Sequence, residues 1–154
     1  MSGKYETRLA ELGVTLPDAP APAANYVPYV IVGDMVYVSG QISGDANGRI
    51  NGKLGADFTV EQGKLAAKTC AISLIAQVKS ACGGDLDRLV QVVKLGGFVN
   101  CTPDFLDHPQ VINGASDFIG AVFGDAGKHA RAAVGSSSLP LGVAVEIEGI
   151  FQIK

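Results

Sequence analysis

The sequence predicts an α+β fold, a two-layer sandwich in which two helices cover one face of a mixed β-sheet. Three observations support this fold: β-rich segments near the start, middle and end of the chain, two long segments with helical spacing of apolar residues, and a length of 154 residues, typical of one domain. Residues 1–154 are therefore interpreted as a single domain. The predicted strands carry apolar residues on both sides, so we expect the face without helices to pack against neighbouring copies in a closed homo-oligomer.

Residues 1–25 are expected to form a helix and an arm ahead of the sheet. Apolar residues at helical offsets predict a short amphipathic helix over 3–12. The stretch 16–25 contains three of the seven prolines. Because proline lacks the N–H that a helix needs, this stretch is expected to be an extended arm or a linker.

A hairpin is predicted to begin the sheet. Residues 26–42 are β-rich on either side of a Gly-Asp turn at 33–34, a dipeptide that commonly closes hairpins. The loop 43–55 is rich in Gly, Asn and Asp, and it has room for a second, short hairpin about Asn47-Gly48.

Two long helices are predicted. Thr59, with Gln62 three residues later, is expected to cap a helix that runs to the Gly-Gly pair at 83–84. Residues 111–124 place their apolar side chains at helical spacing and predict the second helix.

The remaining strands are predicted at 89–100, 130–140 and 142–153. The first follows a turn at 85–88 and is mostly β-branched and apolar, which is typical of a strand buried on both faces. Residues 102–110 contain two prolines and are expected to be a loop or short turn. In the last strand, the alternation of residue types predicts two different faces. One face is apolar and carries Val143, Val145 and Ile147, and the other carries Ala144, Glu146 and Glu148.

Composition excludes some partners and compartments. A formal charge of −3 and a pI near 5.2 provide no clustered positive charge for phosphate, so nucleic acid is not an expected partner. The sequence contains no signal peptide pattern and no apolar run of about 18 residues, so neither export nor a membrane is expected. Cys70, Cys82 and Cys101 match no disulfide or metal pattern, and we expect reduced thiols in a cytoplasmic protein.

Few polar residues remain as candidates for chemistry: Tyr26, Ser39, Asn113, Arg131, Glu146 and Glu148, with His108 and His129 as the imidazoles. Arg131 begins an otherwise small and apolar strand, where a guanidinium needs an anion. That anion is either Glu146 on the last strand, in a structural ion pair, or the carboxylate of a ligand. The two glutamates form a solvated face, unless partial burial raises the pKa of one and makes it a general acid or base.

Other catalytic classes find no support in the sequence. His108 and His129 have no carboxylate at a ligand spacing, so no metal site is expected. Ser39 lies in VSGQI, which is not the GxSxG pattern of a serine nucleophile, and no Walker loop is present.

Several blocks of the chain resemble one family. They are Tyr26, the segment GDMVYVSGQI (33–42), the segments GDL and VVKLGGFVN within 84–100, Asn113 in VINGASDF, and the segments HARAAV and LPLGVAVEIEGI within 129–150. In order and spacing they resemble the Rid family of imine and enamine deaminases, also known as YjgF-type or endoribonuclease L-PSP proteins. The resemblance covers nearly all of the chain from Tyr26 onward.

The resemblance implies a chorismate-mutase-like fold, a homotrimer and ligand sites in clefts between subunits. It assigns Arg131 to the substrate carboxylate, which a planar guanidinium binds through two parallel hydrogen bonds. Glu146, fifteen residues later, would orient or activate water. Tyr26, Ser39 and Asn113 would line the pocket. No metal or organic cofactor is implied.

The chain also departs from the family pattern. Ala133 stands where the family commonly has a cysteine, two residues after the arginine, so a pocket thiol is lost. The N-terminus and the 100–113 region are longer than in the short deaminases, which indicates a longer subgroup.

Three functions follow as hypotheses. The first is cofactor-free hydrolysis of 2-imino or enamino acids to 2-keto acids and ammonia. The second is non-catalytic binding of small carboxylates such as 2-keto acids. The third, RNA cleavage, rests on the older family label alone, and the acidic charge argues against it.

Overall fold

The computed structural model describes residues 3–21 and 24–154, and its main element is a five-stranded mixed sheet. The strand order is β1-β2-β7-β5-β6, in which β5 and β6 are parallel and the other neighbours antiparallel. The strands are β1 (Tyr29–Val32), β2 (Met35–Ile42), β5 (Leu89–Asn100), β6 (Ala130–Ser136) and β7 (Val145–Ile153). A small hairpin of β3 (Gly44–Asp45) and β4 (Gly48–Arg49) turns at Asn47, as the sequence predicts.

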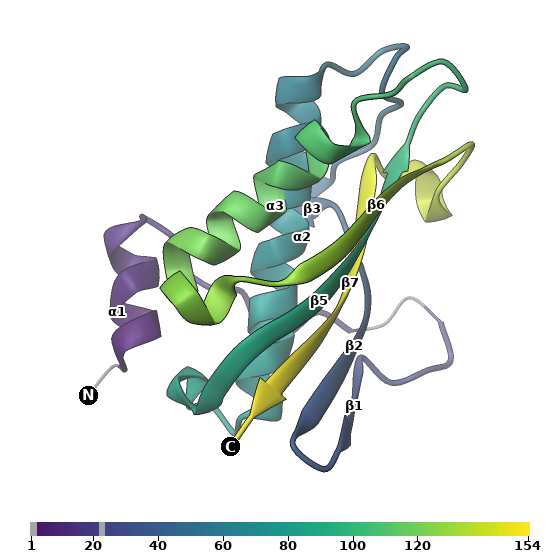
Figure 1. Ribbon diagram of the computed structural model, residues 1–154. Coiled ribbons are helices and arrows are strands. Elements are labelled where there is room, and N and C mark those ends of the chain that lie inside the picture. Colours follow the sequence, from purple (N-terminus) through teal and green to yellow (C-terminus); the bar gives the residue numbers. More distant parts are fainter. Residues whose placement is uncertain (1–2, 22–23) are drawn as a thin grey trace.

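Two long helices, α2 (Val60–Ala81) and α3 (His108–Phe123), pack side by side on one face of this sheet (Figure 1). A short helix, α1 (Lys4–Glu11), lies at the edge of the helix layer, and single 3-10 turns cover Leu86–Arg88, Gly124–Gly127 and Pro140–Gly142. The predicted α+β sandwich with two helices on one face is confirmed. No helix within 3–21 and 24–154 has the length and hydropathy needed to cross a membrane.

The first long helix begins with a capping box. The Thr59 side chain accepts a hydrogen bond from the Gln62 N–H at 3.2 Å, and Gln62 Oε1 accepts one from the Thr59 N–H at 2.8 Å. This reciprocal arrangement satisfies two N–H groups that a helix start leaves unpaired. The N-cap predicted from the sequence is therefore correct.

The two helices approach each other at Gly114 of α3. A Cβ at this position would overlap the backbone carbonyl of Lys64 in α2. Only glycine allows this separation, so the residue that follows Asn113 determines how deeply α3 sits in the helix layer.

Several boundaries differ from the predicted ones. Helix α3 begins at His108 rather than at 111, because Pro109 is tolerated in the first turn of a helix, where its missing N–H costs nothing. The Leu-Pro segment before β7 is a 3-10 turn rather than strand, with Leu141 at φ 61°.

Burial within the sheet also differs in part from the prediction. Strand β5 lies between β7 and β6, but apart from Asn100 at its end only its helix-facing side is buried, because the helices cover one face alone. Ala144, expected beside the glutamates, precedes β7 and is fully buried, and its N–H donates to the Ile50 carbonyl at 3.0 Å.

The face of the sheet without helices is partly apolar. Val30, Tyr37 and Val134 are each 45–48% exposed there, on β1, β2 and β6. Tyr37 lies between Val36 and Val38, which are buried on the helix side, and Val30 pairs with Tyr37 across the hairpin and so shares its face. The predicted contact of this face with other copies stays a prediction.

Candidate functional site

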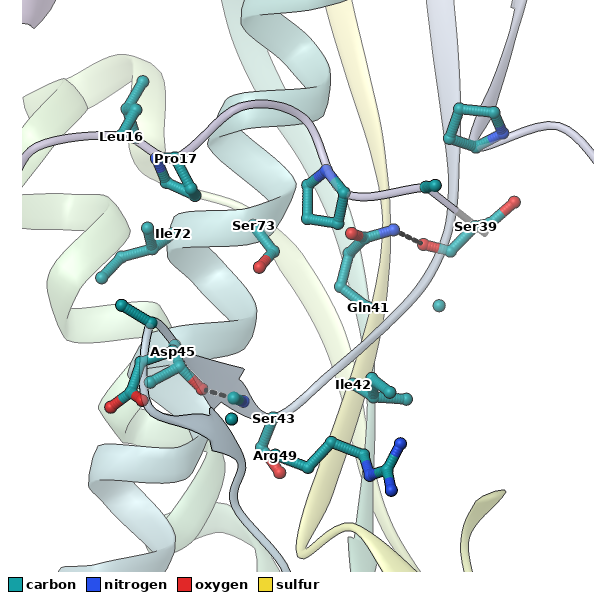
Figure 2. A pocket seen from close by; sticks show the side chains of 18 of the residues that line it. Leu16, Pro17, Ser39, Gln41, Ile42, Ser43, Asp45, Arg49, Ile72 and Ser73 are labelled. Carbon is teal, nitrogen blue, oxygen red and sulfur yellow. Dashed lines mark hydrogen bonds between the residues drawn. The ribbon is translucent and has the colours of Figure 1, made fainter. Parts of the chain in front are cut away.

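The polar candidates gather in two separate hollows of the chain. The first, here called the arm cavity, has a volume of about 700 Å³ and lies between residues 15–21, β2, the β3–β4 hairpin and α2 (Figure 2). The second, here called the Arg131 hollow, has a volume of about 390 Å³ and lies between α3 and the start of β6. Tyr26 and Ser39 line the arm cavity, whereas Asn113 and Arg131 line the Arg131 hollow.

Arg131 is held in place by α3. Its Nη1 donates to Ser116 Oγ at 3.1 Å, and its Nη2 donates to the Pro109 carbonyl at 3.2 Å. Among residues 3–21 and 24–154, no carboxylate lies within ion-pair distance of this guanidinium. The remaining N–H groups of Arg131 are therefore available to an anion from outside the chain.

A histidine and a serine complete the support of Arg131. His129 Nδ1 lies 2.6 Å from the Gly127 carbonyl, which only accepts, so Nδ1 carries a hydrogen. In the neutral ring Nε2 is then an acceptor, and the Ser116 hydroxyl, 2.8 Å away, donates to it. Ser116 thereby turns its oxygen lone pairs toward Arg131, which orients the guanidinium.

Arg131 and Glu146 lie on opposite faces of the sheet. Arg131 of β6 is the register partner of Leu95 in β5, so the two side chains share a face, and Leu95 is fully buried beneath the helices. Glu146 is flanked along β7 by Val145 and Ile147, which are fully buried on that same side, so its own side chain points to the other face. The structural ion pair considered from the sequence is thus wrong for a single chain, since strand β5 separates the two strands as well.

Glu146 lies instead against the irregular part of β2. The register between β2 and β7 shifts between Val38 and Gln41, as in a β-bulge. A Cβ at Gly40, inside this bulge, would overlap the Glu146 carboxylate. The bulge also carries Ser39, so the carboxylate and two residues that line the arm cavity lie together.

Ser39 is used structurally. Its hydroxyl donates to the Val27 carbonyl at 2.9 Å, and its N–H donates to the Pro28 carbonyl at 2.9 Å. These bonds tie the segment that carries Tyr26 to β2.

Burial raises the pKa of Glu146 above its ordinary value of 4.5, and the nearby charge of Glu148 raises it further. A raised pKa means that the folded chain holds this proton more tightly than the unfolded chain does. The stability that the protonated group contributes is fully present below the unfolded pKa, and it is lost as the pH rises through the folded pKa.

We therefore expect Glu146→Gln to unfold at a higher urea concentration than the wild type at neutral pH, and at a similar one at about pH 4. Urea denaturation between about pH 4 and pH 8 measures this difference. Glu148→Gln should reproduce only part of the effect, because burial is the larger cause. Equal pH dependence of wild type and Glu146→Gln would contradict the assignment.

His108 and the three cysteines lie outside both hollows. His108 Nε2 lies 3.4 Å from Cys101 Sγ at the start of α3, and its ring stacks edge-on against Phe105. All three cysteines are buried and free, and burial raises the pKa of the Cys70 and Cys82 thiols. Within the described chain, no three His, Cys, Asp or Glu side chains are grouped to hold a metal ion.

Two residues of the Arg131 hollow, Ser116 and Lys128, are not among those predicted from the sequence. Ser116 follows Asn113 by three positions on α3, and residues at this spacing share a helix face, so the helical pattern contained the signal. Lys128 stands in an exposed turn, and no sequence signal distinguishes it from other surface lysines.

A family model, a curated protein and solved structures each match most of the chain. Residues 6–148 match the family model described as "YjgF/chorismate mutase-like, putative endoribonuclease". The chain is 47% identical over 155 residues to protein TCP17 of Trypanosoma cruzi, covering 99% of this chain and 96% of that one. The structure of Atu1372 from Agrobacterium tumefaciens is 46% identical, with a TM-score of 0.89 over 97% of this chain and 92% of that one. RidA from an Antarctic Psychrobacter is 31% identical, with a TM-score of 0.60 over 88% and 94%.

Proposed function

The chain belongs to the YjgF/chorismate mutase-like family, and from this membership we propose that it hydrolyses 2-imino acids to 2-keto acids and ammonia, without a cofactor. The observation that carries the proposal is the state of Arg131. Two hydrogen bonds that it donates to α3 fix its guanidinium, while no carboxylate of the described chain neutralises it. A bound carboxylate would supply the missing charge through paired hydrogen bonds.

The reaction needs a fixed carboxylate and a group that moves protons. Water adds through its oxygen to the imine carbon while the π electrons of the carbon–nitrogen double bond move to nitrogen. Glu146 accepts the proton that the water loses, and the nitrogen gains one to become an amine. As the new hydroxyl loses its proton and forms the ketone, the carbon–nitrogen single bond breaks with its electron pair on nitrogen, which is protonated by Glu146 and leaves as ammonia. Because burial raises its pKa, the Glu146 carboxyl accepts a proton more readily than an exposed glutamate does, which suits it to accept and return one.

We propose further that each complete site combines Arg131 of one copy with Glu146 of another. The two residues point to opposite faces of the sheet, so a single small substrate cannot contact both within one chain. The uncovered sheet face exposes Val30, Tyr37 and Val134, and burying such residues favours association. A homotrimer, as the family resemblance implies, would bring three such pairs of half-sites together.

Mixing two inactive variants tests this arrangement. Arg131→Ala and Glu146→Gln are each expected to abolish the hydrolysis of imines produced by an amino-acid oxidase. Hydrolysis is measured as a decrease in the imine that semicarbazide traps, so an inactive variant leaves this trapping unchanged. If the halves come from different copies, dissociating and reassembling the two variants at equal amounts should restore about one quarter of wild-type activity, since each half is intact in half of the copies. Restored activity would support the proposal, and no restoration would contradict the shared site.

The same protein distinguishes hydrolysis from binding alone. If the wild type fails to accelerate any imine but gains thermal stability with 2-keto acids, the chain is a carboxylate-binding protein. Arg131 would serve either function, so the binding alternative retains the same half-site and loses only the role of Glu146.

A further inference from the structure

A series of three hydrogen bonds, here called the His129–Ser116 link, ends on the guanidinium of Arg131. His129 Nδ1 lies 2.6 Å from the Gly127 carbonyl, and His129 Nε2 lies 2.8 Å from Ser116 Oγ. The same hydroxyl oxygen lies 3.1 Å from Arg131 Nη1. Ser116 belongs to α3, whereas Gly127 and His129 precede β6, so the link joins two parts of the fold at the proposed carboxylate anchor.

The end of the link at Gly127 is fixed by packing. Gly127 is buried, and a Cβ at this position would lie 2.7 Å from the Ile119 carbonyl of α3. Residue 127 therefore contacts the helix with no room for a side chain between them. The carbonyl that His129 bonds is held in place, and this fixes the ring in turn.

The hydrogens of the link have one consistent arrangement. A carbonyl only accepts and a guanidinium only donates, so the hydrogen on the ring lies on Nδ1 and the Ser116 oxygen accepts from Arg131. The one hydrogen of the Ser116 hydroxyl is then donated to Nε2 of the neutral His129 ring. A serine within a helix otherwise tends to bond the carbonyl one turn back. His129 thus determines the direction in which the Ser116 lone pairs point.

Two fixed points determine the plane of the Arg131 guanidinium. Nη1 donates to Ser116 Oγ, and Nη2 donates to the Pro109 carbonyl at 3.2 Å. These contacts use two of the five N–H groups of an arginine and leave three, of which a paired contact with a carboxylate needs two. Without Ser116 only one fixed point would remain, and this half-buried side chain would rotate about it. A ligand would then have to immobilise the guanidinium as it binds.

We propose that Ser116 and His129 are positioning residues for the carboxylate anchor, and that His129 acts through the Ser116 hydroxyl to hold Arg131 in its binding orientation. This inference rests on the proposed binding of a substrate carboxylate by Arg131 and deepens it. Immobilising one long side chain lowers affinity by about two- to tenfold, so Ser116→Ala should weaken 2-keto acid binding by this factor. Because the carboxylate is gripped alike before and during the reaction, KM for the imine should rise by the same factor at the wild-type kcat.

Two substitutions of His129 separate its two hydrogen bonds. The glutamine amide reaches about as far as Nε2, so His129→Gln keeps an acceptor for the Ser116 hydroxyl and loses the bond to Gly127. The shorter asparagine reaches about as far as Nδ1, so His129→Asn keeps the bond to Gly127 and loses the one to Ser116. We expect His129→Gln to retain most of the affinity and His129→Asn to weaken binding as Ser116→Ala does. The reverse order would mean that His129 only fastens the turn, and it would overturn the inference.

Further variants separate positioning from folding. Ser116→Thr keeps a hydroxyl and should recover the affinity that Ser116→Ala loses. Ser80→Ala removes a serine hydroxyl of α2 that lies 3.1 Å from Tyr29 Oη, outside both hollows, and should bind keto acids as the wild type does. Ser116→Ala should keep the wild-type urea midpoint, since alanine is a better helix former than serine. A lower midpoint and a lower kcat with unchanged Kd and KM would indicate a structural role and contradict the proposal.

Failure of the proposed function is recognised separately, because the wild type would then neither hydrolyse imines nor bind 2-keto acids. NMR of the side-chain nitrogens at about pH 8 tests the link without any ligand, since it reports the tautomer of His129 and the rotation of the Arg131 guanidinium. We expect the Nδ1–H tautomer, and rotation that is several-fold faster in Ser116→Ala and His129→Asn but not in His129→Gln. The other tautomer, or equal rotation rates in all variants, would overturn the inference.

Discussion

Replacing Arg131 by alanine is expected to weaken the binding of 2-keto acids by about 30-fold or more and to remove imine hydrolysis. Truncating one partner of a hydrogen-bonded charge pair costs about 2–5 kcal/mol. Arg131 is only half-buried, so the lower part of this range applies. Isothermal titration with a keto acid measures the loss of binding, and the oxidase-coupled assay measures the loss of activity.

Two further variants separate charge from geometry. Arg131→Lys keeps the positive charge but loses the planar pair of donors, so it should recover only part of the affinity. Arg8→Ala removes an arginine of α1 that bonds Glu11 and the Ala121 carbonyl, away from both hollows, and should leave binding unchanged. If Arg131→Ala binds keto acids as the wild type does, Arg131 is not the anchor.

Gly114→Ala is expected to destabilise the fold by about 1–3 kcal/mol, the usual range for forcing extra volume into a packed layer. The new methyl group would overlap the Lys64 carbonyl, which is backbone and cannot rotate away. Helix α3 would have to move outward, and Arg131 would lose the positions of Ser116 and Pro109 that support it. Urea denaturation measures the change in the free energy of unfolding.

Gly120→Ala is the matched control on the same helix. A Cβ at position 120 meets nothing within 4 Å, so this change should stabilise the protein by about 0.5–1 kcal/mol through the helix preference of alanine. If both variants shifted stability alike, the close approach at Gly114 would have no energetic consequence.

The local elements could be predicted because their signals lie within a few residues. The Thr59–Gln62 capping box and the Gly-Asp turn at 33–34 are each satisfied by neighbours in the chain, so their geometry follows from residue type and spacing. The observed start of α3 differs from the predicted one because Pro109 is compatible with both a loop and a first helical turn.

The site could be predicted only as a set of residues. Arg131 and Glu146 are fifteen positions apart, and this spacing does not reveal that β5 inserts between their strands or that their side chains point to opposite faces. Likewise, the proline-rich composition of 16–25 predicts an extended arm but not the cavity beneath it. That cavity depends on Gln77, a residue 57 positions from Pro20.

The strand order has a consequence for how the protein is made. Strand β7 lies in the middle of the sheet although it is the last strand along the chain, and Met35 pairs with Gln152. During synthesis the β1–β2 hairpin, both long helices and β5 must therefore wait, with their apolar sides open to water, until residues 145–153 have left the ribosome. Over that interval the nascent chain is exposed to aggregation, and it is the stage at which a chaperone would be needed.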